Sequence, residues 1–208
     1  MPPERGQRLI IATHNVGKLA EFALLLAPHG LNCVASGALN LPEPAETAPD
    51  FAGNAQIKAI AAARATGDWA LADDSGLSVS AMGGAPGVRS ARFAIEAGGY
   101  PQALANIIAA TRVTDHAAFV CAICLAAPSG DTATYLGFCH GTIAAAPRGS
   151  GGFGYDPIFI PTGSALTFGE MDKSTKAAIS HRGRALRQVL AALFPSDPLE
   201  RYAFSLTL

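Results

Sequence analysis

The stretch that most constrains the fold of this chain is an apolar run, residues 70–72, that ends in two adjacent carboxylates, Asp73 and Asp74. A hydroxyl and a glycine follow, and an apolar and polar alternation resumes in residues 77–79. Two acids at the point where a buried strand surfaces are costly, because like charges raise each other's proton affinity. A divalent cation removes that cost, since hard Mg²⁺ prefers carboxylate oxygens. The same residues also favour a plain polar turn, so the stretch alone leaves both interpretations open.

Length and composition predict a globular protein with a large core. The chain has 208 residues, which suits one substantial α/β domain or two closely joined lobes. Hydrophobic residues make up 50% and charged residues 15%, so there is ample apolar material and little sign of disorder. The net charge is −1 and no basic block is present, which argues against a nucleic-acid partner bound along its backbone.

The sequence also predicts a cytoplasmic protein without a membrane partner. Residues 1–6 contain no apolar signal core, and the longest near-uninterrupted apolar stretch, residues 117–127, is shorter than the roughly 20 residues that a membrane helix needs. Cys121 and Cys124 have the C-x-x-C spacing but lie in a strand-like run, where residues i and i+3 face opposite sides of a sheet. We interpret them as core residues rather than as zinc ligands or a redox pair.

A strand, a turn and a helix are predicted at the start of the chain. Residues 8–12 read as a buried strand, and helical spacing begins after residues 13–18. Thr13 or Asn15 would cap the helix, whose free N–H groups form an anion site. Lys18 adds a positive charge where the helix dipole favours an acid, which suggests a phosphate there. An ordinary strand, turn and helix with a solvated lysine is the alternative, because the spacing is not that of a Walker loop.

The remaining elements alternate in a way typical of an α/β fold. A proline-rich loop over residues 41–49 carries Glu46, and the helix that follows carries Lys58. A hairpin turn at residues 128–131 joins the two longest strands. The predicted strands cover residues 31–35, 116–127, 132–145 and 158–161, and the predicted helices cover residues 54–66, 102–110 and 173–193, the last of these interrupted at residues 180–183.

Two further stretches suit a planar, phosphorylated ligand. Residues 149–157 are rich in glycine around two aromatic residues, so the backbone can approach a flat ligand on which Phe153 or Tyr155 stacks. The interruption at residues 180–183 supplies polar donors within a helical segment. Such donors suit the acceptors of a base or the charge of a phosphate.

Six blocks of this sequence, in this order, give it a family resemblance. The chain resembles the inosine triphosphate pyrophosphatase family, whose members hydrolyse non-canonical purine nucleoside triphosphates such as ITP, dITP and XTP. The matching blocks are residues 13–18, Glu46 with residues 54–59, residues 72–77, residues 83–92, residues 151–157 and residues 176–183. Each block alone is modest evidence, but six in the right order at the right separations are highly specific.

The resemblance implies the fold and the assembly. We expect an elongated, two-lobed α/β domain over residues 1–208, built on a long twisted mixed sheet flanked by helices, with the nucleotide in a cleft between the lobes. Homodimers are usual in the family, and Mg²⁺ is the expected cofactor, with Mn²⁺ as an alternative. Residues after about 195 form a tail longer than the family leads us to expect.

The resemblance also assigns roles to individual residues. Glu46, Asp73 and Asp74 would gather Mg²⁺, and Asp74 would also accept the proton of the attacking water. Lys58 would assist in holding the triphosphate and Ser75 would touch the substrate. The triphosphate would be held by Thr13, His14, Asn15, Val16, Gly17 and Lys18. The base and sugar would contact Phe153, Gly154, Tyr155, Asp156, Lys176, His181 and Arg182.

The implied reaction breaks the bond between the α and β phosphates and releases a monophosphate and pyrophosphate. Because adjacent strand residues face opposite sides, Asp73 and Asp74 cannot both point into a cleft from a regular strand. We therefore expect the strand to end or bulge there. A pocket of donors aimed at the 6-keto group of hypoxanthine or xanthine would reject the 6-amino group of adenine, because buried polar groups left unpaired cost about 1–3 kcal/mol each.

Three departures from the family pattern and two rival functions complete the sequence-based expectations. His14 stands where many members have a small residue, and Gly53 and Thr175 stand where an acid is common. A phosphohydrolase acting on other modified triphosphates is the nearest enzymatic alternative. A nucleotide-binding sensor is the alternative without catalysis, and the set of three acids argues against it.

Overall fold

The computed structural model describes residue 3 and residues 6–195, which divide into two compact units. Unit 1 contains the described residues up to Asp74, residues 122–137 and the described residues from Arg182 on, and unit 2 contains Ser75–Cys121 and Phe138–His181. The boundary between the units falls inside the three longest strands. The single domain over residues 1–208 stays a prediction, and the tail after residue 195 lies outside the described residues.

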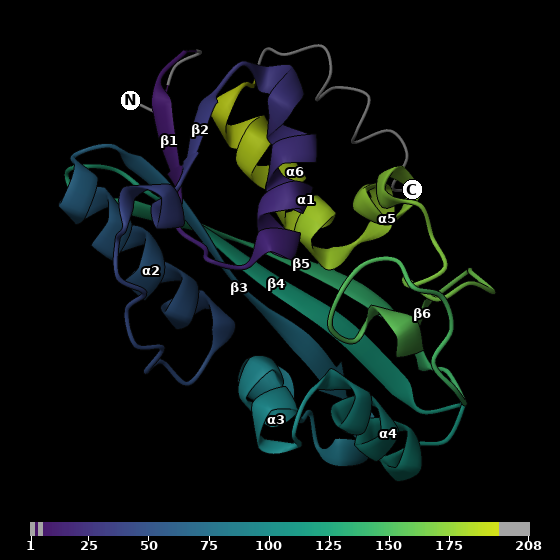
Figure 1. Ribbon diagram of the computed structural model, residues 1–208. Helices are drawn as coiled ribbons and strands as arrows, with labels where there is room; N and C mark the ends of the chain where they lie inside the picture. The colour runs from purple at the N-terminus through teal and green to yellow at the C-terminus, as the bar shows by residue number, and fades with distance from the viewer. Residues whose placement is uncertain (1–2, 4–5, 196–208) are drawn as a thin grey trace. The chain divides into compact units, whose positions relative to one another are not determined.

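Six strands form one mixed sheet in the order β2-β1-β3-β4-β5-β6, which confirms the expected α/β class (Figure 1). Strand β1 runs parallel to β2 and β3, with Ile10 opposite Val34 and Ala70, whereas β5 and β6 are antiparallel. The strands are β1 (Arg8–Ile11), β2 (Asn32–Ala35), β3 (Trp69–Val79), β4 (His116–Ala126), β5 (Thr132–Ile143) and β6 (Phe159–Pro161).

Helices follow each of the strands β1, β2 and β3, and two more follow β6, and within the described residues no helix is long and apolar enough to span a bilayer. The α-helices are α1 (Val16–Leu26), α2 (Phe51–Thr66), α3 (Ser90–Glu96), α4 (Tyr100–Ala110), α5 (Lys173–Ile179) and α6 (His181–Leu193). Short 3₁₀ turns lie at Ala27–His29, Ser36–Leu39, Ser80–Met82, Gly87–Arg89 and Asp156–Ile158.

Helix α2 packs against the sheet in unit 1 through small side chains. Its alanines, among them Ala55 and Ala59, form a buried cluster with Ile10 of β1 and with alternate residues of β3 and β4. Small residues let the helix axis lie close to the strands. The helix begins three residues before the predicted start, because the carboxylate of Asp50 accepts a hydrogen bond from the Gly53 N–H and caps it.

The expectation that strand β3 ends or bulges at the two acids is wrong in its first part, because the strand does not end there. It runs without interruption from Trp69 to Val79, and both Asp73 and Asp74 are buried within it. Ala70 and Ala72 lie in the cluster under α2. By strand alternation Asp74 therefore faces the same side as α2, and Asp73 faces the other. The strand can continue because each acid has a cationic partner, Lys18 and Arg182 for Asp73 and Lys58 for Asp74.

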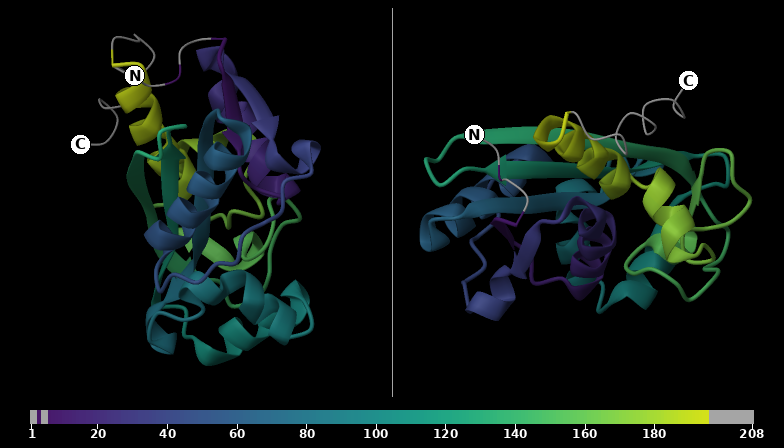
Figure 2. Two further views of the ribbon diagram at one scale, coloured as in Figure 1. Left: turned by 90° about the vertical axis from the view of Figure 1, so that its left-hand side faces the viewer. Right: turned by 90° about the horizontal axis from the view of Figure 1, so that it is seen from above.

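Unit 2 has a core of larger side chains. Phe159 and Phe168 are fully buried and pack with Phe119, Tyr155 and apolar residues of β3, α3 and α4. Helices α3 and α4 lie side by side, in teal in Figures 1 and 2. Helix α3 is not among the helices predicted from the sequence.

The predicted interruption of the last helix is confirmed, but it is shorter than expected. Ser180 alone has an extended backbone, with ψ near 158°, and this ends α5. His181, Arg182 and Gly183 form the first turn of α6 instead of a loop. A single extended residue is sufficient to break the helix, because the next residue can start a new one at once.

Candidate active site

The turn between β1 and α1 presents a helix N-terminus, as predicted. The Asn15 side-chain oxygen accepts a hydrogen bond from the Lys18 N–H at 3.1 Å, and the Thr13 hydroxyl oxygen accepts one from the Asn15 N–H at 3.2 Å. Thr13 is buried, whereas Val16 at the start of α1 is exposed. These contacts fix the turn with the first N–H groups of an 11-residue helix directed at one point, an arrangement that suits an anion.

Lys18 is held by Asp73 and is not a solvated surface lysine. Its ammonium lies 3.1 Å from Asp73 Oδ2, and only 14% of its side chain is exposed. The alternative of an ordinary solvated lysine is therefore wrong. The ion pair keeps the ammonium beside the N-terminus of α1, where a phosphate would find both a charge and N–H donors.

Asp73 is surrounded by cations. Arg182 of α6 donates to its Oδ2 from Nη2 at 2.9 Å and from Nε at 3.2 Å, and Arg182 also pairs with Glu21 of α1. Burial alone would raise the pKa of Asp73, but the charges of Lys18, Arg182 and Lys58 hold it well below its usual value. Asp73 therefore stays ionised, and a carboxylate of such low proton affinity is a poor proton acceptor.

Asp74 has a different environment, made mostly by α2. The Asn54 side-chain amide donates to Asp74 Oδ2 at 3.0 Å, and the Lys58 ammonium lies 3.9 Å from Oδ1. The same ammonium donates to Glu46 at 2.6 Å. Burial raises the pKa of Asp74 above its ordinary value, Lys58 and Asn54 oppose the rise and Glu46 adds to it. This carboxylate has the higher proton affinity that a general base needs.

Lys58 connects the second acid with the proline-rich loop. Burial lowers the pKa of Lys58, but Asp73, Asp74 and Glu46 more than offset this and raise it. The lysine is therefore charged, and it is the point on which Glu46 and Asp74 converge. The proline-rich loop thus brings Glu46 to the Asp74 side of strand β3.

The carboxylate oxygens of Glu46 and Asp74, on either side of Lys58, are suitable ligands for a hard divalent cation. Glu46 and Asp74 offer carboxylate oxygens, and Mg²⁺ is commonly bound by one or two carboxylates together with substrate phosphates. In the part of the chain that the structure describes, no three His, Cys, Asp or Glu side chains form a ready metal cluster. Asp73 is directed at Lys18 and Arg182 instead, and its role as a metal ligand stays a prediction.

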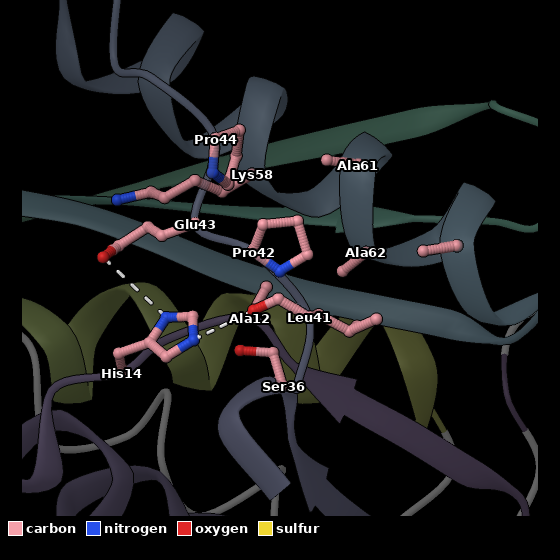
Figure 3. Close-up of a pocket in the computed structure, with 11 residues that line it drawn as sticks. Ala12, His14, Ser36, Leu41, Pro42, Glu43, Pro44, Lys58, Ala61 and Ala62 are labelled. Atoms are coloured by element: carbon pink, nitrogen blue, oxygen red, sulfur yellow. Dashed lines mark hydrogen bonds and ion pairs between the residues drawn. The ribbon is translucent and has the colours of Figure 1, made fainter. Parts of the chain in front are cut away.

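His14 forms a hydrogen bond and an ion pair with the loop that carries Glu46. Its Nε2 donates to the Leu41 carbonyl oxygen at 3.1 Å, and its Nδ1 lies 3.8 Å from Glu43 (Figure 3). Behind it lies a pocket of about 130 Å³ between this loop and α2, lined mainly by alanine, proline and leucine side chains and by the stem of Lys58 (Figure 3). His14 thus lies in the turn between β1 and α1, but its hydrogen bond and ion pair are with the loop, and its role in holding the triphosphate stays a prediction.

The predicted base-binding residues Phe153, Asp156 and Lys176 come together within unit 2. The Lys176 ammonium lies 4.9 Å from the centre of the Phe153 ring and pairs with Asp156 at 2.6 Å. Asp156 Oδ2 also accepts a hydrogen bond from the Phe153 N–H at 2.7 Å. Gly152 has a positive φ, and a Cβ there would lie 2.0 Å from that same oxygen, so only glycine fits.

Other predicted residues lie deeper in the structure than their expected roles suggest. Tyr155 is 3% exposed and its hydroxyl donates to the Ser90 carbonyl oxygen, and burial raises its pKa. His181 is buried and stacks on Phe119 in unit 2. Arg182 is 1% exposed in unit 1. The roles of these residues, and of Ser75 and Gly154, in touching the substrate stay predictions.

Sequence reasoning gave no role to three residues that the structure places at these sites. Asn54 contacts Asp74, and Glu21 contacts Arg182. Tyr100, at the start of α4, packs edge-on against Tyr155 and would contact a side chain added at Gly154. Asn54 stands in one of the quoted blocks, so its polarity within an alanine-rich helix was a usable signal, whereas nothing marked Glu21 or Tyr100.

Comparison with known proteins identifies the family. A family model described as the Ham1 family matches residues 9–192. The dITP/XTP pyrophosphatase of Gluconobacter oxydans is 49% identical over 193 residues, which cover 89% of this chain and 90% of that protein. The dITP/XTP pyrophosphatase of Rhodospirillum centenum is 50% identical, with 91% and 96% covered. The solved structure of a HAM1 protein from Coxiella burnetii matches with a TM-score of 0.81 at 37% identity, covering 91% of this chain and 100% of that one. This chain therefore belongs to the Ham1 family.

Proposed function

We propose that this protein hydrolyses non-canonical purine nucleoside triphosphates, ITP, dITP and XTP, to the monophosphate and pyrophosphate. Relatives about half identical to it over most of their length are named dITP/XTP pyrophosphatases. The observation that carries the chemistry is the buried Asp74 carboxylate, which has one oxygen on Asn54 and the other on the side of Lys58, the lysine that also binds Glu46. A simple nucleotide binder needs donors for phosphate and has no use for a buried base of this kind.

The residues of unit 1 suit the triphosphate and the chemical step. Asp74 accepts the proton of a water molecule as the water oxygen attacks the α phosphorus. The bond from this phosphorus to the bridging oxygen of the β phosphate breaks at the same time. Lys18, Lys58 and the N–H groups at the start of α1 stabilise the negative charge that develops on the departing pyrophosphate. When bound by Glu46 and Asp74, Mg²⁺ supplies neutralisation of phosphate charge and acidification of a coordinated water.

The residues of unit 2 suit a purine with a 6-keto group. The Lys176 ammonium lies over the Phe153 ring, 4.9 Å from its centre, so a base that binds at this ring meets the ammonium as a neighbour. A lysine only donates hydrogen bonds, so it pairs with the O6 of hypoxanthine or xanthine and leaves the 6-amino group of adenine opposite a donor. One such mismatch costs on the order of 1–3 kcal/mol, which is a factor of about 5–150 in kcat/KM.

Product analysis tests the proposal directly. ITP, XTP, GTP and ATP are supplied with and without Mg²⁺, and pyrophosphate is resolved from orthophosphate. We expect monophosphate and pyrophosphate from ITP and XTP, only with the metal. Release of orthophosphate would place attack at the terminal phosphate, and tight ITP binding without turnover would make the protein a sensor. On the family resemblance we also propose that the protein forms a homodimer and is cytoplasmic. Mass measurement in solution tests the homodimer.

A further inference from the structure

Asn54 is a buried polar residue within an alanine-rich helix, and both ends of its side-chain amide are used. It lies in the first turns of α2 and is 1% exposed. Its Oδ1 accepts a hydrogen bond from the Ala48 N–H at 2.9 Å, and its Nδ2 donates to Asp74 Oδ2 at 3.0 Å. Because the Ala48 N–H can only donate, the amide oxygen must face Ala48 and the amide nitrogen must face Asp74.

The bond to Asp74 fixes the plane of that carboxylate, with one oxygen on the amide and the other on the side of Lys58. Asn54 holds Oδ2, while Oδ1 lies on the side of Lys58, 3.9 Å from its ammonium. Rotation of the carboxylate out of this plane would give up the bond to the buried amide, whereas a half-turn only exchanges two equivalent oxygens and restores the same arrangement. Leaving a buried donor unpaired is costly, so the amide keeps Oδ1 directed at Lys58 and Glu46.

The bond to Ala48 fixes the loop that carries Glu46. Ala48 lies two residues after Glu46, and its side chain packs against the start of α2, where a Cβ added at Gly53 would lie 2.5 Å from the Ala48 Cβ. Glycine at position 53 therefore lets the loop lie against the helix, and Asn54 then bonds it there. One side chain thus connects the Glu46 loop with Asp74.

We propose that Asn54 is a positioning residue, which orients Asp74 so that its Oδ1 takes the proton of the attacking water and holds the Glu46 loop beside that oxygen. The assignment rests on the proposed function, in which Asp74 is the proton acceptor. It goes beyond that function because it gives the two Asp74 oxygens different tasks and makes their difference depend on one amide.

The alternative is that Asn54 has a purely structural role and only stabilises the loop. Two substitutions distinguish this role from the orientation of Asp74. Asn54→Asp keeps an acceptor for the Ala48 N–H but removes the donor to Asp74 and sets two carboxylates against each other. Asn54→Ala removes both bonds. Gln56→Ala is the matched control, because Gln56 is an exposed amide on the same helix whose contact is the Thr132 hydroxyl.

The experiment measures kcat and KM for ITP in the presence of Mg²⁺. Separately, it measures the backbone amide hydrogen exchange of residues 46–50 in the metal-free protein. For Asn54→Asp we expect kcat to fall on the order of a hundredfold, with KM and exchange close to those of the parent protein. For Asn54→Ala we expect a similar fall in kcat together with faster exchange. Gln56→Ala should match the parent in all three.

Two results would overturn the inference on its own. A parental kcat in Asn54→Asp would show that the orientation of Asp74 does not depend on the amide. Equal acceleration of exchange in both Asn54 variants, with a raised KM and an unchanged kcat, would reduce the residue to a loop fastening. Failure of the parent protein to release pyrophosphate from ITP would instead overturn the proposed function, and this inference with it.

Discussion

Asp73 and Asp74 are adjacent in one strand, yet their surroundings differ in nearly every respect. Asp73 faces two cations, Lys18 and Arg182, and its pKa is held far below the ordinary value. Asp74 faces an amide, one lysine and a second acid, and its pKa is raised. Strand alternation separates the two carboxylates, and the helices that cover each face then decide what each can do. The first suits a fixed counter-ion and the second a proton acceptor.

The substitution Asp74→Asn should have the largest effect and tests the catalytic half of this comparison. An amide cannot take a proton from water at neutral pH, so kcat should fall by roughly 10²–10⁴-fold. Binding of a non-hydrolysable ITP analogue, measured by calorimetry, should persist because the donors for the phosphates are intact. Normal turnover of this variant would show that another group is the base.

Asp73→Asn tests the structural half. The side chains of Asp73 and Arg182 are 0% and 1% exposed, so removing one partner leaves a buried charge poorly compensated. We expect the free energy of unfolding to fall by roughly 3–5 kcal/mol, measured by denaturant titration. Glu96→Gln is the control, because it breaks an exposed ion pair with Arg89 and should cost less than about 1 kcal/mol. A loss as small as that of the control would mean that Asp73 is dispensable for stability.

Glu46→Gln sharpens the comparison on the Asp74 side. Glutamine keeps an acceptor for Lys58 but removes the charge that a divalent cation would use. The Mg²⁺ concentration for half-maximal activity should rise at least about tenfold, and Mn²⁺ binding measured by calorimetry should weaken equally. Glu43→Gln removes an exposed acid three residues earlier, beside His14, and serves as the control. Equal metal requirements in both variants would exclude Glu46 as a ligand.

The sequence predicted those parts of the fold that depend on neighbours along the chain. The Asn15 cap, the hairpin between β4 and β5 and the break at Ser180 follow from local chemistry, and all are present. The different roles of Asp73 and Asp74 could not be predicted from the sequence. Asp73 is neutralised by Arg182, which lies 109 residues away in the sequence, and no periodicity or spacing marks such a pair.

The same limit explains why an end of β3 at the two acids was expected from the sequence and is not found. Two adjacent acids in a buried strand look prohibitive when only their own repulsion is considered. The structure supplies Lys18 and Arg182 for one acid and Lys58 for the other, so the strand continues. Residues such as Lys58 and Phe153 were found from sequence because they stand in recognisable blocks, whereas the contacts that give them their tasks come from the fold.

The smallest expected effect is a pH dependence of stability that has opposite signs for the two acids. Above its raised pKa, Asp74 is a buried charge beside Glu46 and costs stability. As the pH falls through that value, the folded protein binds the proton first and the cost disappears. Metal-free Asp74→Asn should therefore exceed the parent in free energy of unfolding at pH 7, and the difference should shrink on acidification.

Asp73 should behave in the opposite way. Its folded pKa is depressed, so its contribution to stability is complete above the pKa of about 3.9 of an unfolded aspartate and is lost only as the pH falls below that value. On acidification from pH 7 the advantage of Asp74→Asn should therefore shrink first, whereas the deficit of Asp73→Asn should stay constant until the pH approaches the pKa of an unfolded aspartate. Denaturant titrations of the three proteins across this range measure both trends. Parallel curves for the two variants would mean that the two carboxylates share one environment, and the comparison between them would fail.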